Sequence, residues 1–140
     1  MANSGNRLLA RVVLDTSAYS RLRAGNERVL DIVVNADVVY LPTIVLGELT
    51  AGFRVGRHER ENRQALAEFL DEAFVAVIDV TAEVSERYGE LFGELRERGR
   101  PVPTNDLWVA ACAKSHGAHL VTFDRHFSGF KTLDCLILSA

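Results

Sequence analysis

Residues 101–127, PVPTNDLWVAACAKSHGAHLVTFDRHF, decide the fold, because a helix and a buried strand follow one another within them. Residues 103–105, Pro-Thr-Asn, are typical of a helix start: proline fixes its own φ, and the two polar side chains can cap free backbone N–H groups. Residues 107–113 are apolar throughout, and their alanines let a helix lie close to a sheet. Gly117 suits the left-handed conformation in which many helices end. We therefore expect a buried helix that ends near this glycine.

Two acidic residues flank this helix–strand pair. Asp106 lies in the first turn of the expected helix, where a carboxylate complements the positive end of the helix dipole. Residues 119–122 predict a short buried strand, and Asp124 follows its end. In an open parallel α/β sheet, ligands bind outside the carboxyl ends of the strands, so both acids are candidates for a functional site.

The rest of the chain alternates short apolar runs with helical patterns. Strands are expected over residues 8–14, 38–41, 76–80 and 133–138, and helices over residues 20–23, 27–35, 42–53, 66–70 and 81–98. Thr16 and Ser17 can cap the first of these helices. The alternation is typical of an α/β fold with a central, mostly parallel β-sheet of about five strands flanked by helices.

Composition indicates one globular domain over residues 1–140, in which residues 1–6 are small and polar and are expected to form a flexible tail. No apolar run approaches the roughly 18 residues that cross a bilayer. The N-terminus lacks the pattern of a secretory signal, so we expect a cytoplasmic protein without membrane contact. The net charge of −3 does not favour coating nucleic acid by bulk electrostatics, although a local basic patch or a metal can supply positive charge.

The two cysteines, Cys112 and Cys135, are expected to be free thiols in a reducing compartment. Cys112 and His116 stand one helical turn apart and could form half of a zinc site, but no second pair of ligands completes it.

Two further acids complete a set of four. Asp15 follows the expected first strand, and Glu48 shares a helix side with Ile44 and Gly52, so it can face inward despite its charge. Clustered carboxylates repel one another, and a fold tolerates them chiefly when a cation binds between them. Because the set offers oxygen atoms and no thiol or imidazole, the expected cation is Mg²⁺ or Mn²⁺. Such ions also bind substrate phosphates, which points to phosphoryl transfer or to phosphodiester hydrolysis by metal-activated water.

Four motifs together resemble those of a known family. They are VVLDTSAY at residues 12–19, LGEL at residues 46–49, PTNDLWVAACA at residues 103–113 and LVTFDRHF at residues 120–127. In order, spacing and length the chain resembles PIN-domain proteins, and more narrowly the VapC ribonuclease toxins of type II toxin–antitoxin pairs. The match covers nearly the whole chain, so the resemblance implies a single PIN-like nuclease domain.

The resemblance also implies roles for particular residues. The acidic, metal-binding and catalytic site would consist of Asp15, Glu48, Asp106 and Asp124 with Mg²⁺ or Mn²⁺ as cofactor. The last acid of the family pattern falls at Asp124 or slightly beyond it, where this chain has His126. Residues that would orient carboxylates or the scissile phosphate are Thr16, Ser17, Thr104 and Asn105.

The resemblance further implies an endoribonuclease that cleaves structured RNA of the tRNA or rRNA class. It implies a homodimer, and a co-encoded VapB-type antitoxin whose C-terminal segment lies over the active groove. Independently, the apolar residues between Pro42 and Leu70 outnumber what one small sheet face can bury, which favours dimer packing through these helices. Clustered carboxylates also favour an arginine from the antitoxin as the blocking group, because a guanidinium binds two oxygens at once.

Residues 54–63 hold the main basic concentration of the chain. Arg54, Arg57 and Arg60 are candidates for contact with the RNA backbone. The alternative is a solvated helix start whose charges pair with Glu59 and Glu61, and the sequence does not decide between the two.

Three other functions compete with this interpretation. A flap-type PIN-like nuclease would act on DNA, but the chain lacks insertions that would thread a flap. A phosphate-accepting signalling domain needs a paired acid beside Asp15, where Leu14 and Thr16 stand, and a lysine on a late strand, whereas Lys131 precedes Thr132 in a loop-like context. A catalytically weak RNA-binding PIN module is disfavoured by the intact acid set.

Overall fold

The computed structural model describes residues 9–139, so the tail expected over residues 1–6 lies outside the described residues. A five-stranded sheet forms its centre, in the order β3-β2-β1-β4-β5, and every pair of neighbouring strands is parallel. The strands are β1 (Arg11–Leu14), β2 (Val38–Pro42), β3 (Val75–Ile78), β4 (His119–Thr122) and β5 (Cys135–Ile137). The expected α/β fold with five mostly parallel strands is confirmed.

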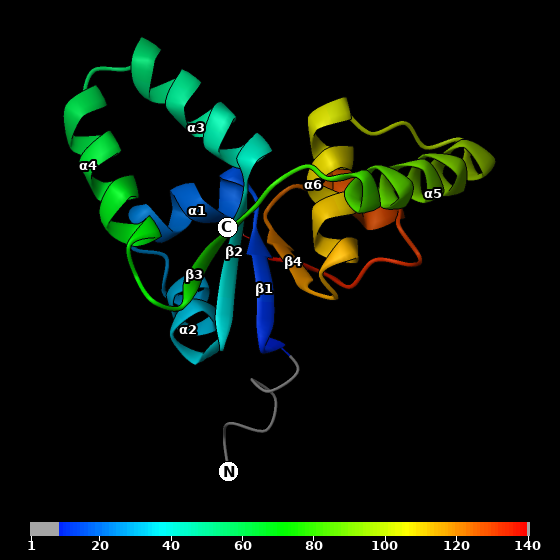
Figure 1. Cartoon of the computed structure of the whole chain (residues 1–140), viewed down its shortest axis with the longest axis horizontal. Helices are drawn as coiled ribbons and strands as arrows, with labels where there is room; N and C mark the ends of the chain where they lie inside the picture. Colours follow the sequence, from blue (N-terminus) through cyan, green and yellow to red (C-terminus); the bar gives the residue numbers. More distant parts are fainter. Residues whose placement is uncertain (1–8, 140) are drawn as a thin grey trace.

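The helices form two layers around this sheet. They are α1 (Thr16–Arg23), α2 (Glu27–Asn35), α3 (Thr43–Val55), α4 (Glu59–Leu70), α5 (Ala82–Arg98), α6 (Thr104–Ser115) and the 3₁₀ helix η2 (Arg125–Gly129). In Figure 1, α1 to α4 lie to one side of the strands and α5 and α6 to the other. Right-handed crossovers require this arrangement, because the strand order runs one way from β1 to β3 and the other way from β4 to β5.

The central strands are buried on both faces, as a parallel sheet covered by two helix layers demands. Residues 12–14 of β1 and residues 120–122 of β4 have no exposed surface. Helix α6 lies against them, and its residues 109–113 are at most 2% exposed. The alanines of α6 therefore bring the helix close to the sheet, as the sequence predicts.

The strand order reverses between β1 and β4, where Leu14 pairs with Val121. Helices that leave two such strands go to opposite faces, and a crevice forms at the carboxyl ends of the strands. Asp15 and Asp124 follow these two strands. The fold thus places the first and the last predicted acid at the topological switch point.

The expected helix starts were wrong in detail. The residue that caps α1 is Asp15, whose carboxylate accepts a hydrogen bond from the backbone N–H of Ala18, and α1 already begins at Thr16. At α6 the cap is Pro103 without a side-chain hydrogen bond, and Thr104 and Asn105 lie inside the helix. The expected end of α6 is confirmed, since Gly117 has φ of 59°.

Both cysteines are free, and burial raises the pKa of Cys112 to about 11 and that of Cys135 to about 12. The Nδ1 atom of His116 lies 3.1 Å from the backbone oxygen of Cys112 rather than near its sulfur. Within residues 9–139 no group of three metal-binding side chains includes this pair. The half zinc site stays without further ligands there.

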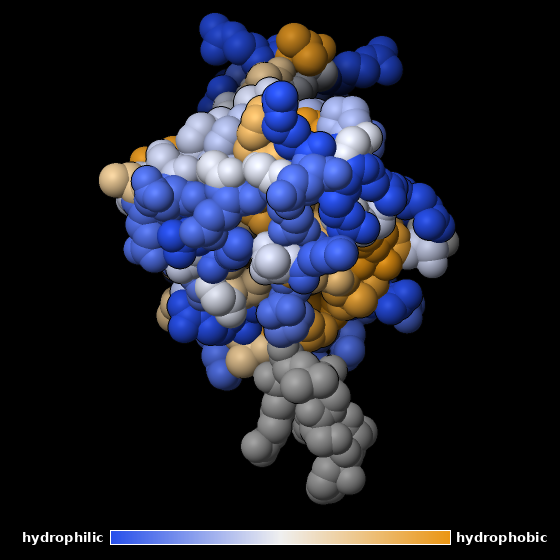
Figure 2. Space-filling view, turned by 90° about the vertical axis from the view of Figure 1, so that its right-hand side faces the viewer, coloured by the Kyte–Doolittle hydropathy of each residue, from blue (hydrophilic) through white to orange (hydrophobic). Residues whose placement is uncertain are grey.

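No helix of the described part of the chain combines the length and the apolar character needed to span a membrane. Figure 2 looks onto the end of α5 and shows hydrophobic side chains at the surface among many hydrophilic ones. Large hydrophobic side chains that reach solvent include Val34, Val55 and Phe92, which are 66%, 87% and 51% exposed.

Candidate active site

Asp15 is the most buried acid of the predicted set, with 6% of its surface exposed. One carboxylate oxygen accepts hydrogen bonds from Ser17 Oγ at 2.7 Å and from the backbone N–H of Ala18 at 2.8 Å. The other accepts a short hydrogen bond from the hydroxyl of Thr122. Burial raises the pKa of this carboxyl group and nearby Asp124 raises it further, while the three hydrogen bonds lower it. The site therefore holds a desolvated carboxylate in a fixed orientation.

Thr122, the last residue of β4, connects this carboxylate to Asp124. Its side chain is fully buried, and its hydroxyl oxygen accepts the backbone N–H of Asp124 at 2.9 Å. Ser17 adds a second connection, because its hydroxyl oxygen accepts the backbone N–H of Phe123 at 3.0 Å. Sequence reasoning missed Thr122, although a hydroxyl at the carboxyl end of a buried strand was the available signal.

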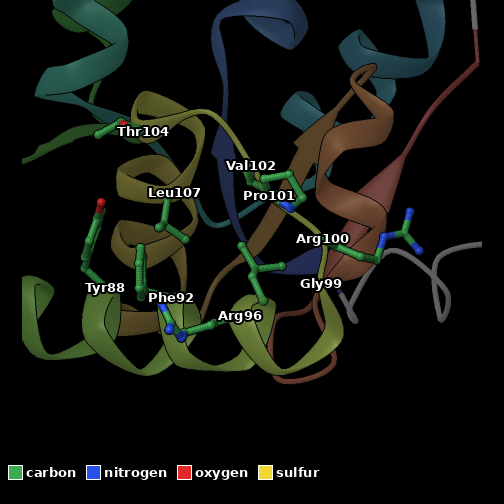
Figure 3. A pocket seen from close by; sticks show the side chains of 10 residues that line it. Tyr88, Phe92, Arg96, Gly99, Arg100, Pro101, Val102, Thr104 and Leu107 are labelled. Carbon is green, nitrogen blue, oxygen red and sulfur yellow. The ribbon is translucent and has the colours of Figure 1, made fainter.

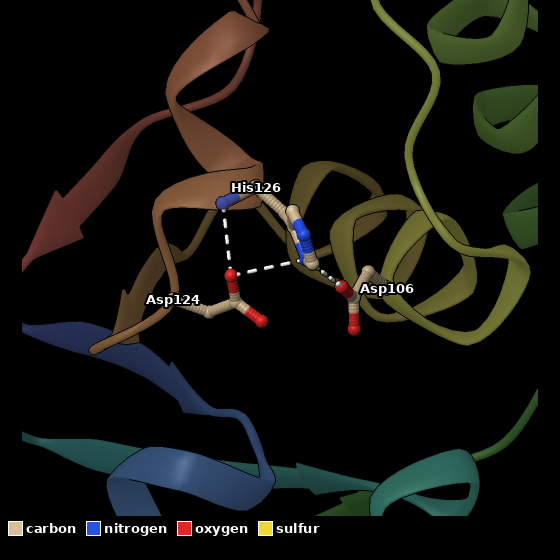
Figure 4. Close-up of side chains that lie close together, drawn as sticks. All are labelled: Asp106, Asp124 and His126. Atoms are coloured by element: carbon tan, nitrogen blue, oxygen red, sulfur yellow. Dashed lines mark hydrogen bonds and ion pairs between the residues drawn. The ribbon is translucent and has the colours of Figure 1, made fainter.

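Asp106, Asp124 and His126 converge above this buried layer, as Figure 4 shows. Their ligand atoms all lie within 4.8 Å of one another. The His126 Nδ1 atom is 3.3 Å from an oxygen of Asp106 and 3.1 Å from an oxygen of Asp124. Asp124 also accepts the backbone N–H of His126 at 2.9 Å, which orients the carboxylate at the start of η2.

The environment of Asp106 raises the pKa of its carboxyl group. Burial is the largest effect and raises its pKa, and the charges of Asp124 and Asp15 raise it as well. The hydrogen bond and the charge of His126 act in the opposite direction. The charge of Asp15 therefore acts on Asp106, but of the four predicted acids only Asp106 and Asp124 belong to the compact group with His126.

Glu48 joins the site through other side chains. Its carboxylate accepts a hydrogen bond from the hydroxyl of Thr16 and another from the amide nitrogen of Asn105 at 3.1 Å. These two residues adjoin Asp15 and Asp106 in the chain, so α3 is attached to the starts of both α1 and α6. Its carboxylate is not part of the compact group of Asp106, Asp124 and His126.

Three of the four predicted orienting residues therefore contact an acid: Thr16, Ser17 and Asn105. The fourth, Thr104, instead lines a cavity between α5 and the start of α6.

The basic segment after α3 is partly neutralised. Arg63 pairs with Glu59 at 2.9 Å, and His58 lies 3.8 Å from Glu61. Within residues 9–139 the three candidate RNA contacts form no ion pair; they are Arg54, Arg57 and Arg60. The ion pairs account for part of the segment, and contact of the other arginines with RNA stays a prediction.

The donor set fits a divalent cation. Carboxylate oxygens of Asp106 and Asp124 lie close together. Burial raises the pKa values of Asp15 and Asp106, and repulsion from neighbouring acids raises them further. A cation would reverse that effect by stabilising the ionised form. The imidazole of His126 adds a nitrogen donor that the expected all-oxygen set did not include. Carboxylates remain the majority, which is the donor type that Mg²⁺ and Mn²⁺ prefer.

Comparison with known proteins assigns the class. Residues 12–139 match the sequence profile of the PIN domain. The chain therefore belongs to the PIN-domain family, and the site described above occupies the crevice of that fold.

Individual relatives narrow this assignment. Ribonuclease VapC2 of Rickettsia felis is 32% identical over 109 residues, which cover 78% of this chain and 78% of that protein. Ribonuclease VapC5 of Mycobacterium tuberculosis is 32% identical over 116 residues, or 83% of this chain and 84% of that protein. The structure of VapBC2 from Rickettsia felis bound to a promoter DNA fragment contains a chain with a TM-score of 0.79 and 26% identity, covering 91% of this chain and 98% of that one. Within the PIN family the chain groups with the VapC ribonucleases.

The raised pKa of Asp106 predicts how the free energy of unfolding depends on pH. Its pKa in the folded protein lies above the ordinary value of 3.8, so the folded state holds this proton more tightly than the unfolded state. The free energy of unfolding therefore loses this contribution as pH rises from about 3.8 through the raised pKa. Asp106→Asn does not suffer this loss, and in EDTA its melting temperature should gain on that of the wild type as pH rises to 7.

The helix dipole opposes this gain, because a carboxylate in the first turn of α6 is worth about 0.3–1 kcal/mol. The control is Glu86→Gln, which also removes one carboxylate but lies on the exposed surface of α5. Melting curves of the three proteins between pH 4 and pH 7 test the prediction. A difference between Asp106→Asn and wild type that does not change with pH would contradict it.

Proposed function

We propose that this chain is the toxin of a VapBC-type toxin–antitoxin pair and acts in the cytoplasm as a Mg²⁺- or Mn²⁺-dependent endoribonuclease on structured RNA of the tRNA or rRNA class. One observation carries the proposal. A carboxylate oxygen of Asp106 and one of Asp124 lie within 4.8 Å of each other, near buried Asp15 and at the switch point of the sheet. The ribonuclease relatives support the same activity.

The proposed nuclease domain spans residues 1–140, and its site residues would have different roles in catalysis. Asp15, Asp106 and Asp124 would hold the ion with Glu48 beside them, and the bound ion supplies positive charge for a phosphate and lowers the pKa of a water. Ser17 and Thr122 fix Asp15, and Asn105 fixes Glu48.

Two side chains of the site are open to solvent. The side chains of Asp124 and His126 are 37% and 55% exposed, and one of them would accept the proton of the attacking water. On the substrate side, Arg54, Arg57 and Arg60, which form no ion pair within residues 9–139, would contact RNA phosphates, since a guanidinium can bind two phosphate oxygens at once.

Removal of metal tests the activity. Purified protein should cleave total RNA with Mg²⁺ or Mn²⁺ and lose cleavage in EDTA, because without the ion no group lowers the pKa of the attacking water. Asp15→Asn and Asp106→Asn should each lower the cleavage rate by about 100-fold or more, as expected when a group that stabilises charge in the transition state is lost. Glu86→Gln is the control and should retain the parent rate.

Cleavage that is equal with and without EDTA would refute the metal mechanism. RNA binding without cleavage in Mg²⁺ would identify a catalytically weak RNA-binding module instead, and preferred cleavage of DNA would identify a DNA nuclease.

A homodimer is the second part of the proposal, packed partly through α3 and α4. Val55 at the end of α3 is 87% exposed, and Phe53 beside it is only half-buried. Such surface favours an interface. Val55→Asp should shift sedimentation at micromolar concentration toward monomer, because association would bury its charge. The matched control is Val34→Asp at an exposed position of α2, and it should leave the dimer intact. A wild type that sediments only as monomer would refute the interface.

A VapB-type antitoxin is the proposed partner, as in the VapBC2 complex from Rickettsia felis. Its C-terminal segment would place an arginine against Asp106 and Asp124, because metal-free carboxylates attract a guanidinium. The dissociation constant of the cognate antitoxin, measured in EDTA, should rise at least about tenfold for the double variant Asp15→Asn/Asp106→Asn, since a charge-assisted hydrogen bond contributes about 1.5–3 kcal/mol. Equal binding of both proteins would exclude this mode of inhibition.

A further inference from the structure

A cavity of about 380 Å³ lies between α5, the start of α6 and the segment that joins them. Figure 3 shows Tyr88 and Phe92 approaching it from α5, Leu107 from α6, and Thr104 at the α6 end. Its walls are largely apolar and aromatic, which is the usual character of ligand pockets of this size. None of these side chains belongs to the acid set described above.

Three aromatic rings, those of Phe92, Tyr88 and Trp108, follow one another in a row that we call the aromatic ladder, and the first two line the cavity. Tyr88 and Phe92 stand one turn apart on α5 and are stacked, with ring centroids 6.4 Å apart and planes at 19°. Tyr88 also lies on Trp108 of α6, with centroids 4.1 Å apart. The outer ring, Phe92, is 51% exposed. The ladder therefore ends in a ring whose outer surface is open for a further planar group to stack on.

Two arginines stand at different places around the cavity. Arg96 follows Phe92 by one turn of α5, and Arg100 stands in the joining segment; both are exposed and both line the cavity. In the part of the chain between residues 9 and 139, neither takes part in an ion pair. An anionic ligand with planar apolar groups matches this combination of side chains.

The cavity adjoins the acid site across a single helix turn. The first turn of α6 presents Thr104 and Leu107 to the cavity, while Asp106 between them interacts with His126 at the acid site. A helix with its side chains is only about 10 Å across. A chain whose phosphate lies at Asp106 can therefore pass over the start of α6 and reach Phe92.

We propose that this cavity is a nucleotide subsite, in which a base of single-stranded RNA near the cleaved bond stacks on Phe92 while its phosphates contact Arg96 and Arg100. The inference rests on the proposed ribonuclease function and identifies where that substrate is held. Bases of any sequence stack on aromatic side chains, and arginines bind the backbone beside them. The two unpaired cations favour this ligand over an apolar face of a protein.

Trp108 supplies the measurement, because it is the single tryptophan of the chain and belongs to the ladder. A short oligouridylate is titrated into the full chain in EDTA, where binding is separated from cleavage. The emission of Trp108 should change and saturate. An abasic oligonucleotide of the same length, which has the phosphates without the bases, should not produce this change. This result does not depend on whether the protein cuts RNA, so failure of the subsite and failure of the nuclease are distinguishable.

Variants test separately the contact of Phe92 with the base and the contact of Arg96 with the phosphates. Phe92→Ala should weaken oligouridylate binding by about 5- to 100-fold, the usual cost of losing one base–aromatic stack. Phe92→Leu keeps apolar volume and should weaken it similarly, whereas Phe92→Tyr should retain it. Arg96→Gln should lower the slope of log affinity against log salt by about 0.7, the value for one phosphate contact on a single strand. Arg28→Gln, on exposed α2, should leave that slope unchanged.

Three results would overturn the proposal. The first is an unchanged Trp108 emission in the presence of oligouridylate. The second is equal affinity of wild type and Phe92→Leu, which has little reason to misfold because Phe92 is half exposed. The third is a loss of dimer on Phe92→Ala, seen by sedimentation, without a change in RNA affinity; the cavity would then be an interface between copies of this chain.

Discussion

The buried Asp15 carboxylate is the constraint on which the rest of the site depends. Removing a charge from water is costly, and here Ser17, Thr122 and the backbone N–H of Ala18 offset the cost by hydrogen bonding. The same three bonds connect the end of β1, the start of α1 and the end of β4. The carboxylate therefore cannot move without disturbing a helix cap and a strand end together, which explains how a fold can hold it within the influence of two further acids.

The site has two levels with different character. Below, Asp15 and Thr122 are almost completely buried and hydrogen bonded. Above, Asp124 and His126 are open to solvent and are positioned by η2, in which the backbone N–H of His126 donates a hydrogen bond to the Asp124 carboxylate. In the proposed mechanism, the lower level would hold one carboxylate in a fixed orientation beside the ion, and the upper level would leave one side free for substrate and water. Glu48 ties α3 to this arrangement through Thr16 and Asn105.

Local pattern was sufficient to predict β4, α6 and the positions of Asp106 and Asp124, because apolar runs and helix-end residues are local signals. It was also sufficient for Asp15, which follows a buried strand. Local pattern marks Thr122 as a hydroxyl at a strand end but does not identify its partner, and it does not predict the contact of Thr104 with the cavity. Thr122 contacts Asp15 only because β1 and β4 are neighbours, and strand order is a property of the whole chain. Thr104 lines the α5 cavity, because α6 begins at Thr104 itself and its side chain belongs to the first turn rather than to the cap.

The separation of Asp15 and Thr122 by 107 residues also fixes when the site comes into being. A ribosome adds about 5–20 residues per second, so roughly 5 to 20 seconds pass between the synthesis of these two residues. Until β4 emerges, the central strand β1 lacks one neighbour and Asp15 lacks its hydroxyl partner. The complete set of contacts around Asp15 therefore forms only near the end of translation, which under the proposed function would keep the nuclease inactive until a partner could bind the finished fold.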